Sequence, residues 1–187
     1  MSARFVRSLF AIAVAVLVAG VTPAHAQAKP SPGAGPILVM QTLKGTIEIE
    51  TYPNEAPKSV EHIVALVNRR FYNGQRIHRV EPGFVVQFGD PTTRDMTKQA
   101  DWGRYGSGKS IGVGEMSKMR THVRGAVALA HRGDPGEADS QLYICLRAAP
   151  ELDGDFTVVG KVISGMDVAD KLEVTDRIVR ITVREAK

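Results

Sequence analysis

Short apolar and β-branched runs succeed one another along most of the chain, and this pattern most constrains its fold. In Thr46–Glu50, Ile47 and Ile49 alternate strictly with polar neighbours, and the closing run 179–184 alternates in the same way. A period of two is typical of half-buried β-strands. We expect strands at or near residues 37–40, 46–50, 76–80, 84–87, 126–130, 141–146, 156–163 and 179–184. Because no βαβ alternation links these runs, they favour a closed antiparallel sheet.

Two helices are expected among the strands. Pro57 suits a first helical position, where its missing N–H costs nothing. Val60, Ile63, Val64 and Val67 then follow the i, i+3, i+4, i+7 spacing of an amphipathic helix. A second, shorter helix is predicted over 166–172, after a Ser-Gly break. The fold class is therefore mainly β with few helices.

The N-terminus has the three parts of a secretory signal peptide. Arg4 and Arg7 precede an apolar run over 9–21, and Ala24 and Ala26 occupy the −3 and −1 positions of an A-x-A site that is cut after Ala26. We expect residues 1–26 to be removed on export, in the periplasm of a two-membrane cell; the alternative is an uncleaved anchor. Residues 27–36 are rich in Pro and Gly and read as a flexible lead-in. Residues 37–187 suit a single domain, with no membrane association after cleavage.

Charge and side-chain spacing argue against several function classes. The chain has 24 Lys and Arg against 20 Asp and Glu, which becomes 22 against 20 without the two signal arginines. A near-neutral domain gives no reason to expect nucleic-acid binding. Cys145 is the only cysteine; its apolar neighbours indicate a buried side chain. The histidines show no metal-ligand spacing, so no metal or cofactor is expected.

The segment Gly103–Ser110 matches the phosphate-binding pattern G-x-x-x-x-G-K-[ST] letter for letter. That pattern cradles phosphates only between a buried strand and a helix. Here the preceding residues are polar, and two more glycines at 112 and 114 oppose a helix start. A flexible surface loop is the favoured interpretation, and a phosphate-binding enzyme remains the weak alternative.

Three blocks carry a more specific signal. Residues 71–90 read FYNGQRIHRVEPGFVVQFGD; residues 125–130 and 139–144 read GAVALA and DSQLYI; residues 152–162 read LDGDFTVVGKV. Together they resemble the cyclophilin family over nearly the whole chain after the lead-in. The resemblance implies a closed eight-stranded antiparallel β-barrel capped by two α-helices, and a monomer. It also implies a peptidyl-prolyl cis/trans isomerase that acts on proline-containing segments of exported proteins and assists their folding. A binding module or chaperone with little turnover is the alternative.

The resemblance also assigns site residues. Arg79, Phe84 and Gln87 match the catalytic positions. The substrate-binding set that it implies is Leu129, Ala130, His131, Tyr143, Leu152 and Phe156. Rotation about an X–Pro bond needs no nucleophile, only stabilisation of the twisted amide, which the rigid donors of an arginine can provide. Gln87 would bond the substrate carbonyl or hold Arg79. His78 should point to the opposite strand face and be structural.

Four positions depart from the family pattern. Tyr143 stands where a phenylalanine is frequent, so its hydroxyl needs a partner. Leu129 replaces a methionine and Phe156 a histidine. Glu151 replaces a tryptophan that helps bind cyclosporin in sensitive members, so weak binding of this drug is expected.

Overall fold

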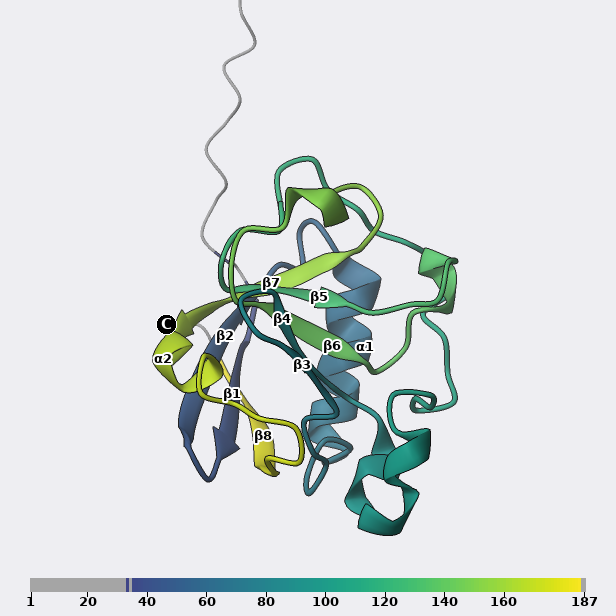
Figure 1. Cartoon of the computed structure of the whole chain (residues 1–187). Helices are drawn as coiled ribbons and strands as arrows, with labels where there is room; N and C mark the ends of the chain where they lie inside the picture. Colours follow the sequence, from purple (N-terminus) through teal and green to yellow (C-terminus); the bar gives the residue numbers. More distant parts are fainter. Residues whose placement is uncertain (1–32, 34, 186–187) are drawn as a thin grey trace, which may run out of the picture.

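The computed structural model describes Gly33 and residues 35–185. Its strands are β1 (Ile37–Thr42), β2 (Gly45–Thr51), β3 (Arg79–Glu81), β4 (Val85–Phe88), β5 (Ala126–Leu129), β6 (Leu142–Cys145), β7 (Val158–Ser164) and β8 (Ile178–Arg184). The helices are α1 (Pro57–Asn68) and α2 (Met166–Ala169), with 3₁₀ turns η1 (Pro91–Arg94), η2 (Met96–Asp101), η3 (Pro135–Glu137) and η4 (Pro150–Leu152). Figure 1 shows these elements around one curled sheet. The mainly β class is thus confirmed, and every predicted strand overlaps an observed one, although β3 covers only 79–81 where 76–80 was predicted.

All the strand ladders of the described chain are antiparallel and form an eight-stranded sheet in the order β3-β4-β6-β5-β7-β2-β1-β8. The end strands β3 and β8 do not share a ladder. A single bridge between Arg76 and Arg177 joins the segments just before them, and the backbone N–H of Ile178 donates to the carbonyl of Gln75 at 2.8 Å. The predicted barrel is therefore closed by a few bonds at one corner, and elsewhere it is a curled half-barrel.

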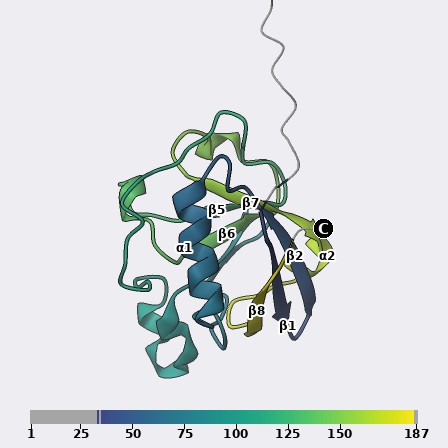
Figure 2. The same cartoon turned by 180° about the vertical axis from the view of Figure 1, so that it is seen from behind.

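Helix α1 lies against one side of the sheet, behind it in Figure 1 and in front of it in Figure 2. Pro57 is at the first helical position, as its sequence context predicts. Val60, Ile63 and Val67 are buried on the inner side, so the predicted apolar stripe is confirmed. Helix α2 is shorter than predicted and ends at Ala169, and the chain continues in turns to Leu172, which is buried nonetheless.

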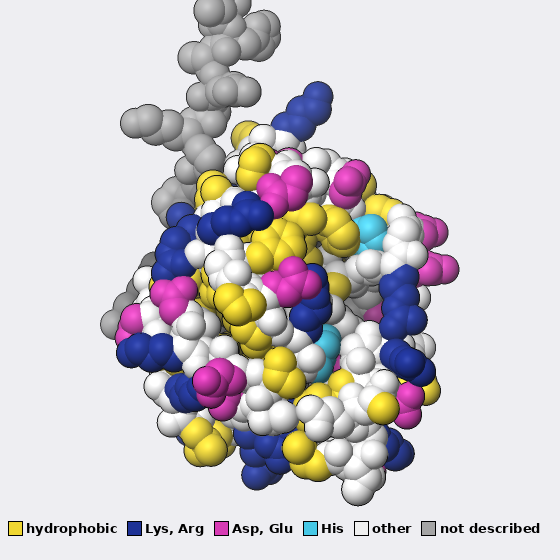
Figure 3. Space-filling model, viewed as in Figure 1, with side chains coloured by type: hydrophobic (Ala, Val, Ile, Leu, Met, Phe, Trp, Pro, Cys, Tyr) yellow, Lys and Arg dark blue, Asp and Glu magenta, His cyan; other side chains and the backbone are white. Residues whose placement is uncertain are grey.

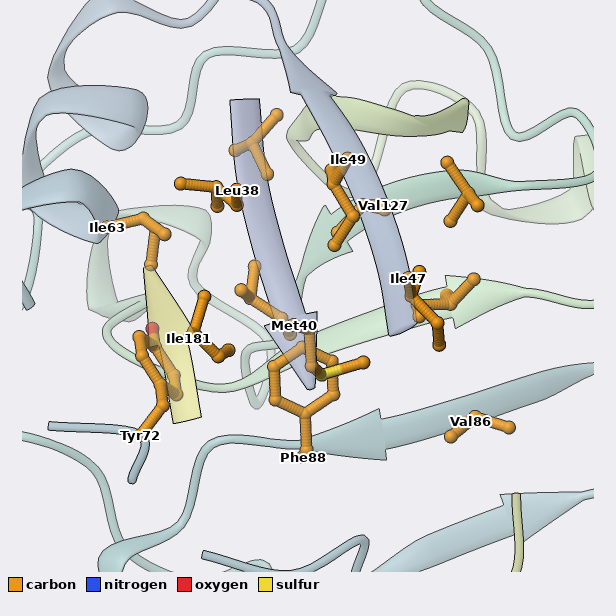
Figure 4. Close-up of a cluster of buried hydrophobic side chains, with 14 of the residues drawn as sticks. Leu38, Met40, Ile47, Ile49, Ile63, Tyr72, Val86, Phe88, Val127 and Ile181 are labelled. Carbon is orange, nitrogen blue, oxygen red and sulfur yellow. The ribbon is translucent and has the colours of Figure 1, made fainter. Parts of the chain in front are cut away.

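The main core fills the inside of the curled sheet. Figure 4 shows Met40 of β1, Ile47 of β2 and Phe88 of β4 converging there, and all three are fully buried. A second buried cluster lies on the other face of β4, β5 and β6, and it includes Cys145. Burial raises the pKa of the Cys145 thiol to about 12, which keeps it protonated. The prediction of a buried cysteine is confirmed.

The predicted signal peptide, residues 1–26, lies outside the described residues. Of the lead-in, the structure describes Gly33, Gly35 and Pro36, which run beside β2. The Gly35 N–H donates to the carbonyl of Thr51 at 3.3 Å, and the Thr51 hydroxyl donates to the Pro36 carbonyl at 2.7 Å. No helix in the described part of the chain has the length and apolarity needed to cross a membrane.

Candidate active site

One hollow of about 220 Å³ gathers most of the predicted site residues beside β3, β4 and β6. Its lining consists of Arg79, Phe84, Val85, Gln87, Ala130, His131, Tyr143, Leu152 and Phe156. These residues come from strands β3, β4 and β6, from the turn between β3 and β4, from the loop after β5, and from η4 and the loop that precedes β7. Figure 3 shows this face, where hydrophobic side chains lie next to arginine, lysine and histidine around a hollowed area.

The tertiary structure fixes the direction of the Arg79 guanidinium. Arg79 on the edge strand β3 pairs in register with Gln87 on β4. Its Nη1 donates to Gln87 Oε1 at 3.1 Å, and its Nε donates to Glu81 Oε1, also at 3.1 Å. Arg79 Nη2 donates to that same oxygen of Glu81. Two acceptors thus hold one guanidinium at the rim of the hollow, and N–H groups remain for a ligand.

Gln87 is held in turn from behind. Its Nε2 donates to Gln141 Oε1 at 2.8 Å. Gln141 Nε2 then donates to the carbonyls of Gly103 and Tyr105, both at 2.9 Å. The amide oxygen of Gln87 accepts from Arg79, and its Nε2, the group that would have to donate to a substrate carbonyl, already donates to Gln141. This arrangement favours the second of its two predicted roles, which is to position the arginine.

Aromatic and aliphatic side chains make up the apolar wall. The rings of His131 and Phe156 lie 4.4 Å apart, and Phe156 meets Tyr143 edge-to-face at 5.9 Å. His131 Nε2 donates to the carbonyl of Asp155 at 2.9 Å, which fixes the ring. The Tyr143 hydroxyl finds the partner that the sequence requires in His122 Nε2, at 2.9 Å. The result is a rigid apolar floor next to a cationic rim, which suits a cyclic, uncharged side chain.

Comparison with known proteins identifies the family. Residues 37–186 match the family described as cyclophilin type peptidyl-prolyl cis-trans isomerase/CLD. The chain belongs to the cyclophilin family. A probable peptidyl-prolyl cis-trans isomerase of Brucella abortus (strain 2308) is 41% identical over 139 residues, which cover 73% of this chain and 70% of the relative. The rat peptidyl-prolyl cis-trans isomerase-like 3 is 37% identical over 136 residues, which cover 73% and 81%.

Solved cyclophilins share the fold. A cyclophilin type peptidyl-prolyl cis-trans isomerase of Cryptosporidium parvum superposes with a TM-score of 0.69 at 23% identity, covering 82% of this chain and 99% of that one. The cyclophilin AquaCyp293 of Hirschia baltica gives 0.67 at 22% identity, covering 81% and 74%. At these identities the likeness speaks for the fold alone. The enzyme class rests on the family match and on the relatives with higher identity.

One residue predicted for the pocket of this cyclophilin lies elsewhere. Leu129 is buried in the main core inside the sheet and is absent from the lining of the hollow. Successive side chains of a strand point to opposite faces, so Ala128 and Ala130 face the hollow side and Leu129 faces the core. By the same alternation Val85 on β4 lines the hollow, although sequence reasoning gave it no role.

The Gly103–Ser110 segment of this cyclophilin is a loop without helix or strand, as its flanking residues predict. This loop binds the carboxylate of Asp139. Ser107 Oγ donates to Asp139 Oδ1 at 2.5 Å, and the Gly108 N–H donates to Asp139 Oδ2 at 2.9 Å. His62 Nε2 lies 3.1 Å from the same group. Partial burial raises the pKa of Asp139, but these hydrogen bonds outweigh it and bring the pKa below its ordinary value. The loop donors therefore serve an anion of the protein itself, which counts against a phosphate site.

His78 packs against this loop and not into the hollow. A Cβ atom added to Gly103 would lie only 3.2 Å from His78 Cδ2, so the imidazole packs closely against this glycine. Gly103 has a positive φ of 83°. Burial lowers the pKa of His78 to about 4, although the Asp90 carboxylate acts in the opposite direction. These contacts agree with the structural role that strand alternation predicts.

The lowered pKa of His78 predicts an acid-sensitive fold. An unfolded histidine binds its proton near pH 6.5, whereas folded His78 does so only near pH 4. The stability from this group is complete above pH 6.5 and is lost as the pH falls towards 4. We expect this group to lower the free energy of unfolding by about 2–3 kcal/mol between pH 7.5 and pH 4.5.

Urea unfolding of the wild type and of His78→Leu at both pH values measures this contribution. Leucine cannot ionise, so the variant should lose less stability on acidification by that amount. Equal losses in the two proteins would show that other groups cause the acid sensitivity.

Proposed function

We propose that this cyclophilin accelerates X–Pro bond rotation by seating the proline ring in the 220 Å³ hollow, with Arg79 directed at the prolyl nitrogen. The observation that carries the proposal is the Arg79 guanidinium, held by Gln87 and Glu81 at the rim of an apolar floor. A Cryptosporidium parvum cyclophilin with the same fold was crystallised in the presence of the dipeptide Ala-Pro, and this supports a prolyl ligand here.

The chemistry requires only these parts. Amide resonance sets a barrier of about 18–20 kcal/mol to rotation about a peptide bond. As the bond twists, the prolyl nitrogen regains a lone pair, which an N–H donor of Arg79 can bind. That hydrogen bond exists only in the twisted form, so it lowers the barrier without tightening the planar substrate. The surrounding rings remove water from the proline and strengthen the bond.

A protease-coupled assay on a tetrapeptide with a central Ala-Pro bond tests the proposal. Catalysed cis-to-trans conversion by the wild type, lost in Arg79→Ala, supports it. A binding module would instead bind proline-containing peptides with similar affinity in both proteins and would leave the uncatalysed rate unchanged. The wild-type rate therefore decides between catalysis and holding.

We further propose that the chain acts on exported proteins and assists their folding by accelerating slow prolyl isomerisation steps. The support is the signal-like N-terminus: two arginines, an apolar run and the Ala24-x-Ala26 site. The full chain, expressed in a bacterium with two membranes, should yield a periplasmic product that begins at Gln27.

N-terminal sequencing and fractionation check this expectation. An Ala26→Phe variant is the matched control, because a large side chain at the site blocks cleavage and should leave the precursor unprocessed. A wild-type product that keeps residues 1–26 would favour the uncleaved anchor.

A further inference from the structure

Three buried or half-buried side chains, linked by hydrogen bonds, lie behind the pocket wall. His122 Nδ1 lies 2.7 Å from Asp153 Oδ1, and His122 Nε2 lies 2.9 Å from the Tyr143 hydroxyl. The His122 side chain is only 1% exposed, whereas that of Asp153 is 32% exposed. The three residues come from different segments: the loop before β5, strand β6 and the loop after η4.

The chemistry of the three groups fixes the direction of the hydrogen bonds. A carboxylate only accepts, so the proton of a neutral His122 ring must be on Nδ1, facing Asp153. Nε2 is then an acceptor, and the Tyr143 hydroxyl must donate to it. Burial raises the pKa of Tyr143 above its ordinary range, so the hydroxyl keeps its proton for this bond.

His122 joins the two parts of the pocket wall. Its side chain holds Tyr143, whose ring lines the hollow and meets Phe156 edge-to-face. Its backbone N–H donates to Asp153 at 2.7 Å, and its carbonyl accepts from Ala149 N–H at 2.7 Å. Both contacts bracket η4, which carries the wall residue Leu152.

We propose that His122 is a positioning residue for the isomerase reaction, acting through the Tyr143 hydroxyl to set the wall against which the proline ring packs. The inference rests on the proposed proline pocket. Without the imidazole, the buried hydroxyl has lost its acceptor and must turn towards the hollow or towards water. Either movement shifts the Tyr143 ring, and a small misplacement of a bound substrate lowers the rate strongly.

A double-mutant cycle tests this coupling. The four proteins are the wild type, His122→Ala, Tyr143→Phe and the double variant. For each of them kcat/KM is measured on the Ala-Pro peptide. We expect a fall of about tenfold in the tyrosine background. In the phenylalanine background no hydroxyl is left without a partner, and the fall should be less than about twofold. An equal fall in both backgrounds would mean that His122 only packs, and would overturn the proposal.

Asp153→Ala provides the second arm if His122→Ala does not fold. Asp153 is partly exposed, and its loss frees the Nδ1 proton, so the imidazole no longer has a fixed direction. The same background dependence is expected, and its absence would again overturn the proposal. Arg79→Ala in the same assay keeps the two ideas apart: an active wild type that loses turnover without Arg79 upholds the proposed function whatever the cycle shows.

Discussion

Arg79→Ala is expected to lower kcat/KM on a prolyl peptide by about 10²–10³, the usual cost of removing one well-placed transition-state donor. The guanidinium is the cationic donor that Gln87 and Glu81 hold at the rim of the hollow. The fold should survive, because the Arg79 side chain is 42% exposed and its partner Glu81 is 50% exposed. Exposed ion pairs contribute about 1 kcal/mol or less.

Arg180→Ala is the matched control for this prediction. Arg180 is an exposed arginine on β8, the opposite edge strand of the sheet, where its Nε donates to Gln41. Arg180→Ala removes the same charge and the same side chain as Arg79→Ala but leaves the hollow intact, so turnover should be unchanged. Thermal unfolding of both variants checks the fold. Turnover of Arg79→Ala at the wild-type level would refute the role assigned to the guanidinium.

Cyclosporin is expected to inhibit this cyclophilin weakly, because Glu151 occupies the position where the family pattern often has tryptophan. Glu151 lies on η4 next to the wall residue Leu152, and it forms an exposed ion pair with Arg147 at 2.7 Å. An apolar macrocycle would have to remove water from this carboxylate or displace it, and it gains no aromatic contact. Losing an aromatic anchor commonly costs about 2 kcal/mol or more, which is at least about 30-fold in affinity.

Inhibition of the isomerase reaction by cyclosporin measures this effect in three proteins. Glu151→Trp should recover much of the lost affinity with little change in peptide turnover. Glu151→Ala is the matched control, since it removes the charge and frees Arg147 without adding an indole, and it should recover less. Nanomolar inhibition of the wild type would show that another side chain takes the role of the tryptophan, and equal inhibition of all three would leave Glu151 without influence.

Local patterns were enough to predict most of the secondary structure. Ile47 and Ile49 mark β2 because strict alternation of apolar and polar residues is typical of a half-buried strand. Pro57 and the apolar stripe behind it locate α1 for a similar reason, since both signals lie within a few residues. The end of α2 was missed because Leu172 is buried, and burial in a turn looks the same in the sequence as burial on a helix face.

The catalytic candidates Arg79, Phe84 and Gln87 could be named because they fall in one contiguous segment. Within such a segment the spacing between residues can be compared directly with the family pattern. The wall of the pocket could not be assigned in the same way. In β5 every residue is buried on one face or the other, so hydrophobicity does not show that Leu129 points into the core and Ala130 into the hollow.

Contacts between distant segments were decided by the tertiary structure alone. His122 and Tyr143 are 21 residues apart, and Ser107 and Asp139 are 32 residues apart. Hydrogen bonds of this kind depend on how two loops and a strand meet in space, and no periodicity records them. The sequence by itself determined the strand-rich class, the first helix and the segment that carries Arg79. Folding then decided which faces enclose the hollow, because that choice depends on the register and curl of the sheet and not on the character of any one residue.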